Sequence, residues 1–99
     1  MAIPIYTPRV NNNDDLVRFS HTFVSAGAEV RQGDPLADVE TDKATFTVEA
    51  EQDGYVLGFV QTVGEMIPVG SVLLWMGDSP KENIPQPAEE LHQAFPLFF

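Results

Sequence analysis

The sequence predicts an all-β fold, a flattened antiparallel β-barrel or sandwich with a pseudo-two-fold axis. Two observations lead to this prediction. Apolar and polar residues alternate in short runs, as they do along strands that face a core on one side only. A pattern punctuated by glycines also recurs after 37 residues. Each half is too small to bury an apolar face alone, so the two halves are expected to pack on one another.

The expected strands are short and are bounded by glycine, proline, asparagine or aspartate, which favour turns. The clearest strand covers residues 44–50, where Ala44, Phe46, Val48 and Ala50 alternate with polar residues and are expected to face the core. The other expected strands cover residues 3–6, 16–23, 36–40, 55–60 and 72–76.

The two halves of the repeat carry similar residues at equivalent positions. Both follow the order strand, glycine, short apolar pair, glycine, strand. The first half ends at Asp42-Lys43 and the second runs into Gly77-Asp78, and we expect these two tips at opposite places on the domain. The equivalent residues, 37 positions apart, are Phe23 and Val60, Gly27 and Gly64, Val30 and Ile67, Gly33 and Gly70, Leu36 and Leu73, and Val39 and Met76.

Large apolar side chains are expected to form the core or its rim. Met66 and Met76 are expected to fill gaps within that core. The aromatic residues expected to pack there are Phe19, Phe23, Phe46, Tyr55, Phe59 and Trp75.

The composition disfavours several classes of function. The 99 residues include 15 acids and 5 bases, and the net charge of −10 would repel nucleic acid and anionic membrane surfaces. There is no cysteine, and His21 and His92 are too far apart in the sequence to propose a metal site. The chain shows no nucleophilic triad and leaves little room for an enclosed active site, so we expect no catalysis.

The chain is expected to comprise one domain over residues 1–79 and a linker or tail over residues 80–99. Prolines punctuate this tail, residues 88–95 are compatible with two helical turns, and the apolar end 95–99 could dock on the domain or on a partner. The N-terminal residues resemble no signal peptide, and no segment is long and apolar enough to span a bilayer, so a cytoplasmic protein is expected.

Lys43 stands out because it is one of only two lysines in the chain, the other being Lys81 in the tail. The strands over 36–40 and 44–50 predict a hairpin with Thr41-Asp42-Lys43-Ala44 at its tip. Such a tip would hold the amine exposed and in a fixed direction, within reach of a modifying enzyme.

Acidic residues are expected to form a negative collar around this lysine. Glu40 and Asp42 precede Lys43, and Glu49 and Glu51 lie on the returning strand. A negative surface of this kind favours a basic partner. From these residues alone, Lys43 could also be an ordinary surface lysine paired with an acid, a contact that contributes only about 0–1 kcal/mol.

The stretch from Gly33 to Thr45, GDPLADVETDKAT, resembles the lipoyl domains of 2-oxo acid dehydrogenase complexes. The likeness continues through Gly54-Tyr55-Val56 and from Gly64 to Leu73, so that it covers about residues 2–78. The Glu-Thr-Asp-Lys-Ala-Thr string most resembles dihydrolipoyl acetyltransferases, the acyltransferases of pyruvate dehydrogenase. The resemblance implies the lipoyl/biotinyl carrier fold, with two four-stranded sheets.

The resemblance also implies a function. A lipoate ligase or lipoyl transferase would recognise Glu40, Thr41, Asp42 and Ala44 and attach lipoic acid to Lys43 in amide linkage. The arm would accept an acyl group at a 2-oxo acid decarboxylase and pass it to coenzyme A at an acyltransferase core. A dihydrolipoyl dehydrogenase would then reoxidise it. The chain itself would be a non-catalytic carrier in the cytoplasm, or in the mitochondrial matrix of a eukaryote.

The first loop is a departure from the family pattern. Residues 8–15 are more polar and richer in asparagine than is usual. In the family this loop lies near the lysine hairpin and contributes to the choice of decarboxylase, so the acyl group, whether acetyl, succinyl or branched, stays open. The residues assigned to partner recognition on this basis are Asn11, Asn12, Asn13, Asp14 and Asp15.

Two alternatives share the predicted fold. A biotin carrier domain of a carboxylase would have methionine on both sides of the lysine, whereas Asp42 and Ala44 flank Lys43 here and favour lipoate. An interaction module of the same fold would carry no modification at all, and the unusual first loop and the apolar tail motivate that reading.

Overall fold

The computed structural model describes residues 1–84 of the chain. The helical turns and the apolar end expected within residues 88–99 lie outside this part, and the boundary expected after residue 79 stays a prediction. Residues 1–84 form eight strands and no helix. The strands are β1 (Ile3–Tyr6), β2 (Leu16–Thr22), β3 (Glu29–Val30), β4 (Pro35–Glu40), β5 (Thr45–Glu49), β6 (Gly54–Phe59), β7 (Met66–Pro68) and β8 (Val72–Gly77).

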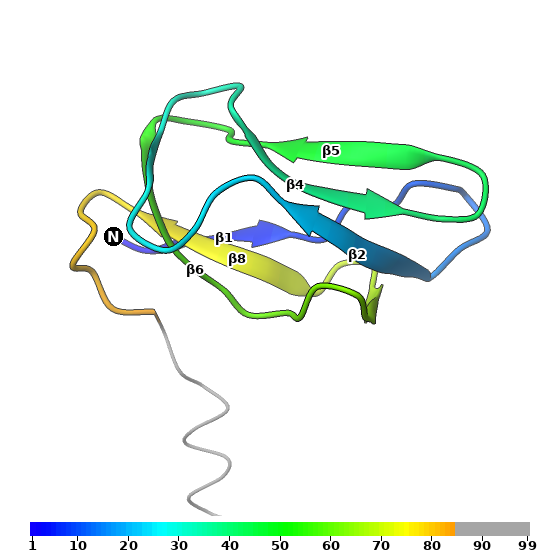
Figure 1. Cartoon of the computed structure of the whole chain (residues 1–99). Coiled ribbons are helices and arrows are strands. Elements are labelled where there is room, and N and C mark those ends of the chain that lie inside the picture. Colours follow the sequence, from blue (N-terminus) through cyan, green and yellow to red (C-terminus); the bar gives the residue numbers. More distant parts are fainter. Residues whose placement is uncertain (85–99) are drawn as a thin grey trace, which may run out of the picture.

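The strands form two antiparallel sheets that face each other as two layers (Figure 1). One sheet has the order β1-β8-β6-β3 and the other has the order β5-β4-β2-β7. The predicted all-β fold with two four-stranded sheets is therefore confirmed. The sequence prediction missed β3 and β7, because strands of two or three residues are too short to show an alternating pattern.

The sheet orders show the expected pseudo-two-fold relation. Exchanging β1 with β5, β2 with β6, β3 with β7 and β4 with β8 converts one sheet order into the other. β4 and β8 are separated by 37 residues at both ends, as the repeat requires. Each sheet therefore takes two strands from each half of the repeat: β1 and β3 join β8 and β6 in one sheet, and β5 and β7 join β4 and β2 in the other.

The repeated glycines hold equivalent left-handed turns. Gly27 has a φ of 92° and Gly64 has a φ of 98°, a region in which a side chain would be strained. The Gly27 N–H donates to the Val56 carbonyl at 2.7 Å, and the Gly64 N–H donates to the Phe19 carbonyl at 2.7 Å. These turns fasten each half to a strand of the opposite half.

The core lies between the two sheets and draws on both halves of the repeat. The equivalent residues Leu36 and Leu73, like Val39 and Met76, are buried. The buried apolar residues are Ile5, Val17, Phe19, Val30, Leu36, Ala37, Val39, Val48, Ala50, Val56, Ile67, Leu73, Leu74 and Met76.

Four expectations about buried side chains are wrong. Phe46 is 47% exposed and Met66 is 51% exposed, Phe23, which follows the end of β2, is 46% exposed, and Ala44 is exposed as well. β5 and β7 are the two edge strands of their sheet, so the alternating pattern continues beyond the area that the opposite sheet covers. Phe46 instead lines a shallow groove of about 300 Å³ together with Tyr6 and Val48.

The two tips lie at opposite ends of the domain, as expected (Figure 1). The β4–β5 turn forms one end, and the N-terminus and the segment after β8 form the other. There the Met1 amine lies 3.0 Å from the Asp78 carboxylate and 2.6 Å from the Glu82 carboxylate. The hydrogen bond with Glu82 raises the pKa of the Met1 amine, and the same bond lowers the pKa of Glu82.

The segment after β8 packs back against β6 and β8. The Glu82 side chain also accepts the Asp78 N–H at 2.9 Å. The Ile84 Cδ1 atom lies 3.0 Å from the position that a Cβ would take on Gly58. A larger residue at 58 would therefore displace Ile84, so residues up to 84 belong to the packed part of the structure.

Candidate functional site

Lys43 lies in the turn of the β4–β5 hairpin, as the sequence predicts. Glu40 pairs with Thr45 at the end of the ladder, and the Thr41 N–H donates to the Ala44 carbonyl at 2.9 Å. The lysine therefore stands at the very end of two paired strands, which fix the direction of the turn.

A threonine hydroxyl organises this turn from inside. Thr41 Oγ1 accepts the N–H of Lys43 at 3.2 Å and the N–H of Ala44 at 3.3 Å. The side chain that bonds the backbone of this turn is thus that of Thr41, the first residue of the turn. Asp42 is left exposed, and so are Lys43 and Ala44. The lysine amine is thus accessible, and the small Ala44 leaves space beside the lysine side chain.

The first loop lies beside the hairpin turn because of the register between β2 and β4. Arg18 pairs with Glu40 in this antiparallel ladder. Residues that precede β2 must therefore lie beside residues that follow β4. The contact is a hydrogen bond from Asn11 Nδ2 to Thr41 Oγ1 at 2.9 Å.

The same loop is tied together by its own polar groups. Asn11 Nδ2 also donates to Asp14 Oδ2 at 2.9 Å. The Arg9 guanidinium donates to the Asp14 carbonyl at 3.0 Å and to the Asp15 carboxylate at 3.2 Å. Of the five residues assigned to partner recognition, Asn11, Asp14 and Asp15 thus make hydrogen bonds within the domain, and Asn12, Asn13 and Asp15 are exposed.

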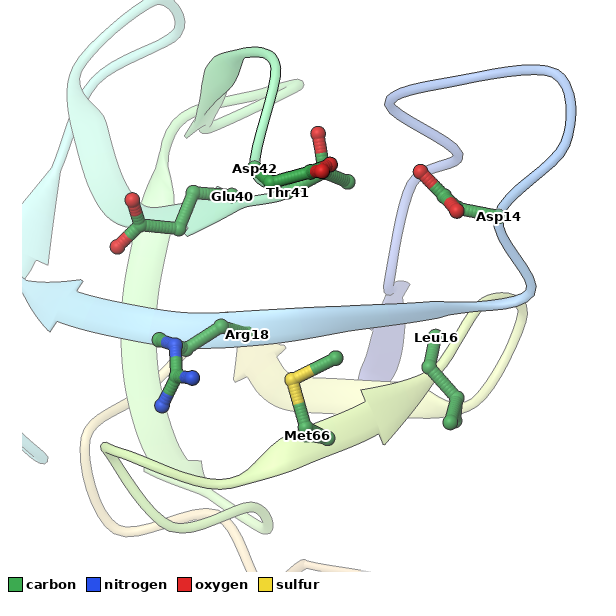
Figure 2. Close-up of a pocket in the computed structure, with 7 residues that line it drawn as sticks. All are labelled: Asp14, Leu16, Arg18, Glu40, Thr41, Asp42 and Met66. Carbon is green, nitrogen blue, oxygen red and sulfur yellow. The ribbon is translucent and has the colours of Figure 1, made fainter.

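A shallow pocket of about 390 Å³ lies next to the turn (Figure 2). Figure 2 shows Asp14, Glu40 and Asp42 on one side of β2 and Met66 on the other. The apolar surface comes from Leu16, which is 49% exposed, and from Met66. The residues that line the pocket are Asp14, Leu16, Arg18, Glu40, Thr41, Asp42 and Met66.

The expected acidic collar has a different membership. Glu49 pairs with Pro35 at the far end of the hairpin, four residues beyond Thr45 and therefore roughly 13 Å further along the strand. Glu49 and Glu51 line the groove beside Phe46 instead. Asp14 belongs to the acidic group instead, because the β2–β4 register places it beside Glu40 and Asp42 in the lining of the pocket.

Sequence reasoning missed the pocket residues Leu16, Arg18 and Met66. Leu16 and Met66 could have been noticed as apolar residues of the outward-facing parity of their strands. Their closeness to the lysine turn follows only from the sheet order β5-β4-β2-β7. The Arg18 guanidinium donates to the Gly64 carbonyl at 3.2 Å, so it also fastens the turn before β7.

Other classes of site find no support in the described residues. Within residues 1–84, no three histidine, aspartate or glutamate side chains are grouped closely enough to hold a metal ion. The same residues include no helix with the length and apolar character needed to cross a membrane.

Comparison with protein families identifies a family for most of the chain. A family model described as "Biotin-requiring enzyme" matches residues 6–76, which include every strand except the first residues of β1 and the end of β8. The matched region contains the first loop, the lysine hairpin and both halves of the repeat.

Two curated proteins are similar in sequence. The dihydrolipoyllysine-residue acetyltransferase component of the pyruvate dehydrogenase complex of Rhizobium meliloti is 36% identical over 64 residues, or 65% of this chain. The mitochondrial protein X component of the pyruvate dehydrogenase complex of Chaetomium thermophilum is 44% identical over 41 residues, or 41% of this chain. The matches cover 14% and 9% of the lengths of these relatives.

Solved structures share the fold. The lipoyl domain of the 2-oxoglutarate dehydrogenase complex of Azotobacter vinelandii superposes with a TM-score of 0.66 at 25% identity, covering 78% of this chain and 98% of that domain. The urea carboxylase of Kluyveromyces lactis contains a region that superposes with a TM-score of 0.65 at 22% identity, covering 78% of this chain and 6% of the carboxylase. At that identity the second likeness concerns the fold alone.

Proposed function

The chain belongs to the biotin- and lipoyl-attachment family, as a non-catalytic carrier domain, and we propose that it carries lipoic acid on Lys43. The observation that carries the proposal is the place of Lys43, exposed in a turn that two paired strands hold at one end of the domain. A modifying enzyme needs such a protruding amine, and a transfer between active sites needs an arm that points away from the domain.

The residues around Lys43 fit an amide-linked lipoyl group. The turn is fixed by Thr41, the neighbour Ala44 is small, and Asp42 is exposed. When bound, the lipoyl group supplies a dithiolane that accepts an acyl group and two electrons, and the protein supplies presentation. Glu40, Thr41, Asp42 and Ala44 are the residues that we assign to recognition by a lipoate ligase or lipoyl transferase.

The proposed partners are those of a 2-oxo acid dehydrogenase complex. A decarboxylase would load the arm, an acyltransferase core would unload it to coenzyme A, and a dihydrolipoyl dehydrogenase would reoxidise it. The likeness to two pyruvate dehydrogenase components supports pyruvate as the 2-oxo acid. The acids Asp14, Glu40 and Asp42 beside the turn favour a basic surface on the partner. We place this role in the cytoplasm, or in the mitochondrial matrix of a eukaryote.

Intact mass tests the attachment. The chain is co-expressed with a lipoate ligase in the presence of lipoate, and we expect a mass gain of one lipoyl group. Lys43→Arg should abolish this gain, because an arginine cannot form the amide. Lys81→Arg is the matched control, since Lys81 is the other lysine and is also exposed, and it should leave the gain unchanged.

A second co-expression of the same variants distinguishes attachment of biotin from attachment of lipoate. Co-expression with a biotin ligase and a streptavidin blot should give no signal, because Asp42 and Ala44 flank the lysine where a biotin carrier has methionine. A wild-type mass that stays unchanged with both ligases would rule out the carrier role and leave an unmodified interaction module. A streptavidin signal that requires Lys43 would reassign the domain to a biotin-dependent carboxylase.

A further inference from the structure

We propose that Asn11 is a positioning residue that sets the geometry of the Lys43 turn through Thr41. Its side-chain nitrogen lies 2.9 Å from Thr41 Oγ1 and 2.9 Å from Asp14 Oδ2. One carboxamide thus links the first loop to a hairpin turn that lies 30 residues away in the sequence. We call Asn11, Asp14 and Thr41 the polar latch.

The chemistry of Asp14 determines the orientation of the Asn11 carboxamide. An ionised carboxylate accepts hydrogen bonds and donates none, so the NH₂ group of Asn11 must face it. That group has two hydrogens, which suits two acceptors on either side. Both donors are therefore used within the domain, and Asn11 and Thr41 are both partly buried at this contact.

Thr41 connects Asn11 to the backbone of the lysine turn. Its Oγ1 atom accepts from Asn11 and also accepts the N–H groups of Lys43 and Ala44. A single oxygen thus joins the first loop to the backbone of the modified residue. If the oxygen moves, the peptide N–H groups that direct the lysine lose their acceptor.

The loop end of the polar latch is held by further hydrogen bonds of its own. Arg9 donates to the Asp14 carbonyl and to the Asp15 carboxylate, and the Asp14 N–H donates to the Asn11 carbonyl at 3.3 Å. These contacts use the polar side chains of Arg9, Asn11, Asp14 and Asp15 to build the loop. The loop and the lysine turn therefore behave as one unit, and a partner that contacts the loop also acts on the turn.

A double-mutant cycle tests the polar latch. Solvent exchange of the Lys43 and Ala44 N–H groups is measured by NMR in the wild type, Asn11→Ala, Thr41→Val and the double variant. Loss of one hydrogen bond should speed exchange about twofold to tenfold. Because Asn11 acts through Thr41, the double variant should be no faster than Thr41→Val, and Thr41→Ser should restore the wild-type rate.

Asn12→Ala is the matched control for exchange, since Asn12 is the exposed neighbour of Asn11 and should leave both N–H groups unchanged. Exchange that is unaffected by Asn11→Ala, or equally affected by Asn12→Ala, would overturn the inference. So would additive effects of Asn11→Ala and Thr41→Val, because the two residues would then act separately.

The consequence for modification rests on the proposed function. With a lipoate ligase, Asn11→Ala should slow lipoylation of Lys43 about twofold to tenfold, because a looser turn presents the amine less often in the right geometry. The control is Asn83→Ala, an exposed asparagine at the other tip, which should match the wild type. Equal rates in Asn11→Ala and the wild type would overturn this consequence. Absence of lipoylation in every variant would refute the proposed function. The double-mutant cycle of N–H exchange would still show whether the polar latch holds the turn.

Discussion

The turn after β4 and the segment after β8 occupy equivalent positions in the two halves, yet within residues 1–84 only the first is followed by a strand that returns to pair with the one before it. β5 follows the Lys43 turn directly and pairs with β4. In the other half the place of β5 is taken by β1, which comes from the N-terminus and pairs with β8. β8 and β1 are not consecutive in the chain, so no turn joins them, and the ion pair between the Met1 amine and Asp78 connects their ends instead.

The two lysines of the chain make this difference informative. Lys43 lies in the closed turn, and Lys81 lies one residue beyond the position equivalent to it. Both are exposed, and both have acids nearby. The two lysines differ in the structure that holds them. Lys43 lies in a turn held by the β4–β5 ladder and the polar latch, whereas Lys81 lies in the segment that follows β8. Under the proposed function, we therefore expect the hairpin, more than the lysine itself, to make the attachment site.

The largest expected effect comes from moving the motif from one tip to the other. Ser79→Asp, Pro80→Lys and Lys81→Ala place Asp-Lys-Ala at the equivalent positions of the second tip, and Lys43→Arg removes the first site. We expect no lipoylated mass after co-expression with a lipoate ligase, because no returning strand holds the new lysine. The same three changes with Lys43 intact should give one lipoyl group. Modification of the transplanted lysine would show that the tripeptide suffices.

Matched truncations in the core should have the next largest effect and should be equal in the two halves. Leu36→Ala and Leu73→Ala remove equivalent side chains that are 0% exposed. Each should lower the free energy of unfolding by about 2–5 kcal/mol, through lost burial and a cavity between the sheets. Urea unfolding of both variants measures this. Costs that differ by more than the error would mean that the two halves do not share the core evenly.

The repeated glycines should give a smaller and again paired effect. Gly27→Ala and Gly64→Ala place a side chain at a positive φ, although no atom lies within 4 Å of the new Cβ. Each should cost about 1–2 kcal/mol of backbone strain, since crowding adds nothing. Thermal unfolding of the two variants checks the prediction, and a stable Gly64→Ala beside a destabilised Gly27→Ala would break the equivalence of the two turns.

The smallest expected effect concerns the ion pair that closes the second tip. The hydrogen bond with the Met1 amine lowers the pKa of Glu82 below its ordinary 4.5, and Glu82 raises the pKa of the amine above its ordinary 8.0. The contribution of Glu82 to stability is therefore present above pH 4.5 and is lost as the pH falls through its lowered pKa. That of the amine is present below pH 8.0 and is lost as the pH rises through its raised pKa.

Glu82→Gln should remove this pH dependence at both ends of the range. The difference in melting temperature between wild type and Glu82→Gln should be small at neutral pH, because the Met1 side of the pair is 93% exposed, and should vanish in strong acid and strong base. A difference that persists in acid would assign the effect to packing of the Glu82 side chain against β8 and not to its charge.

The lysine hairpin and the repeat could be predicted from the sequence because both depend on local signals. Alternation over residues 44–50 predicts a strand, and glycines at equal spacing predict equivalent turns. The same local reasoning placed Phe46 and Met66 in the core, where they do not lie. Alternation shows which face a side chain takes, and whether another sheet covers that face depends on its place at the edge.

The sequence by itself determined the all-β fold, the two halves and the position of Lys43 at the tip of a hairpin, since these follow from periodicity and turn residues. The tertiary structure alone decided which groups surround that lysine. The β2–β4 register brings Asn11 and Asp14 to Thr41 and leaves Glu49 at the far end of the hairpin. Contacts between residues 30 positions apart depend on how strands pair, and strand pairing is settled only when both sheets close on a common core.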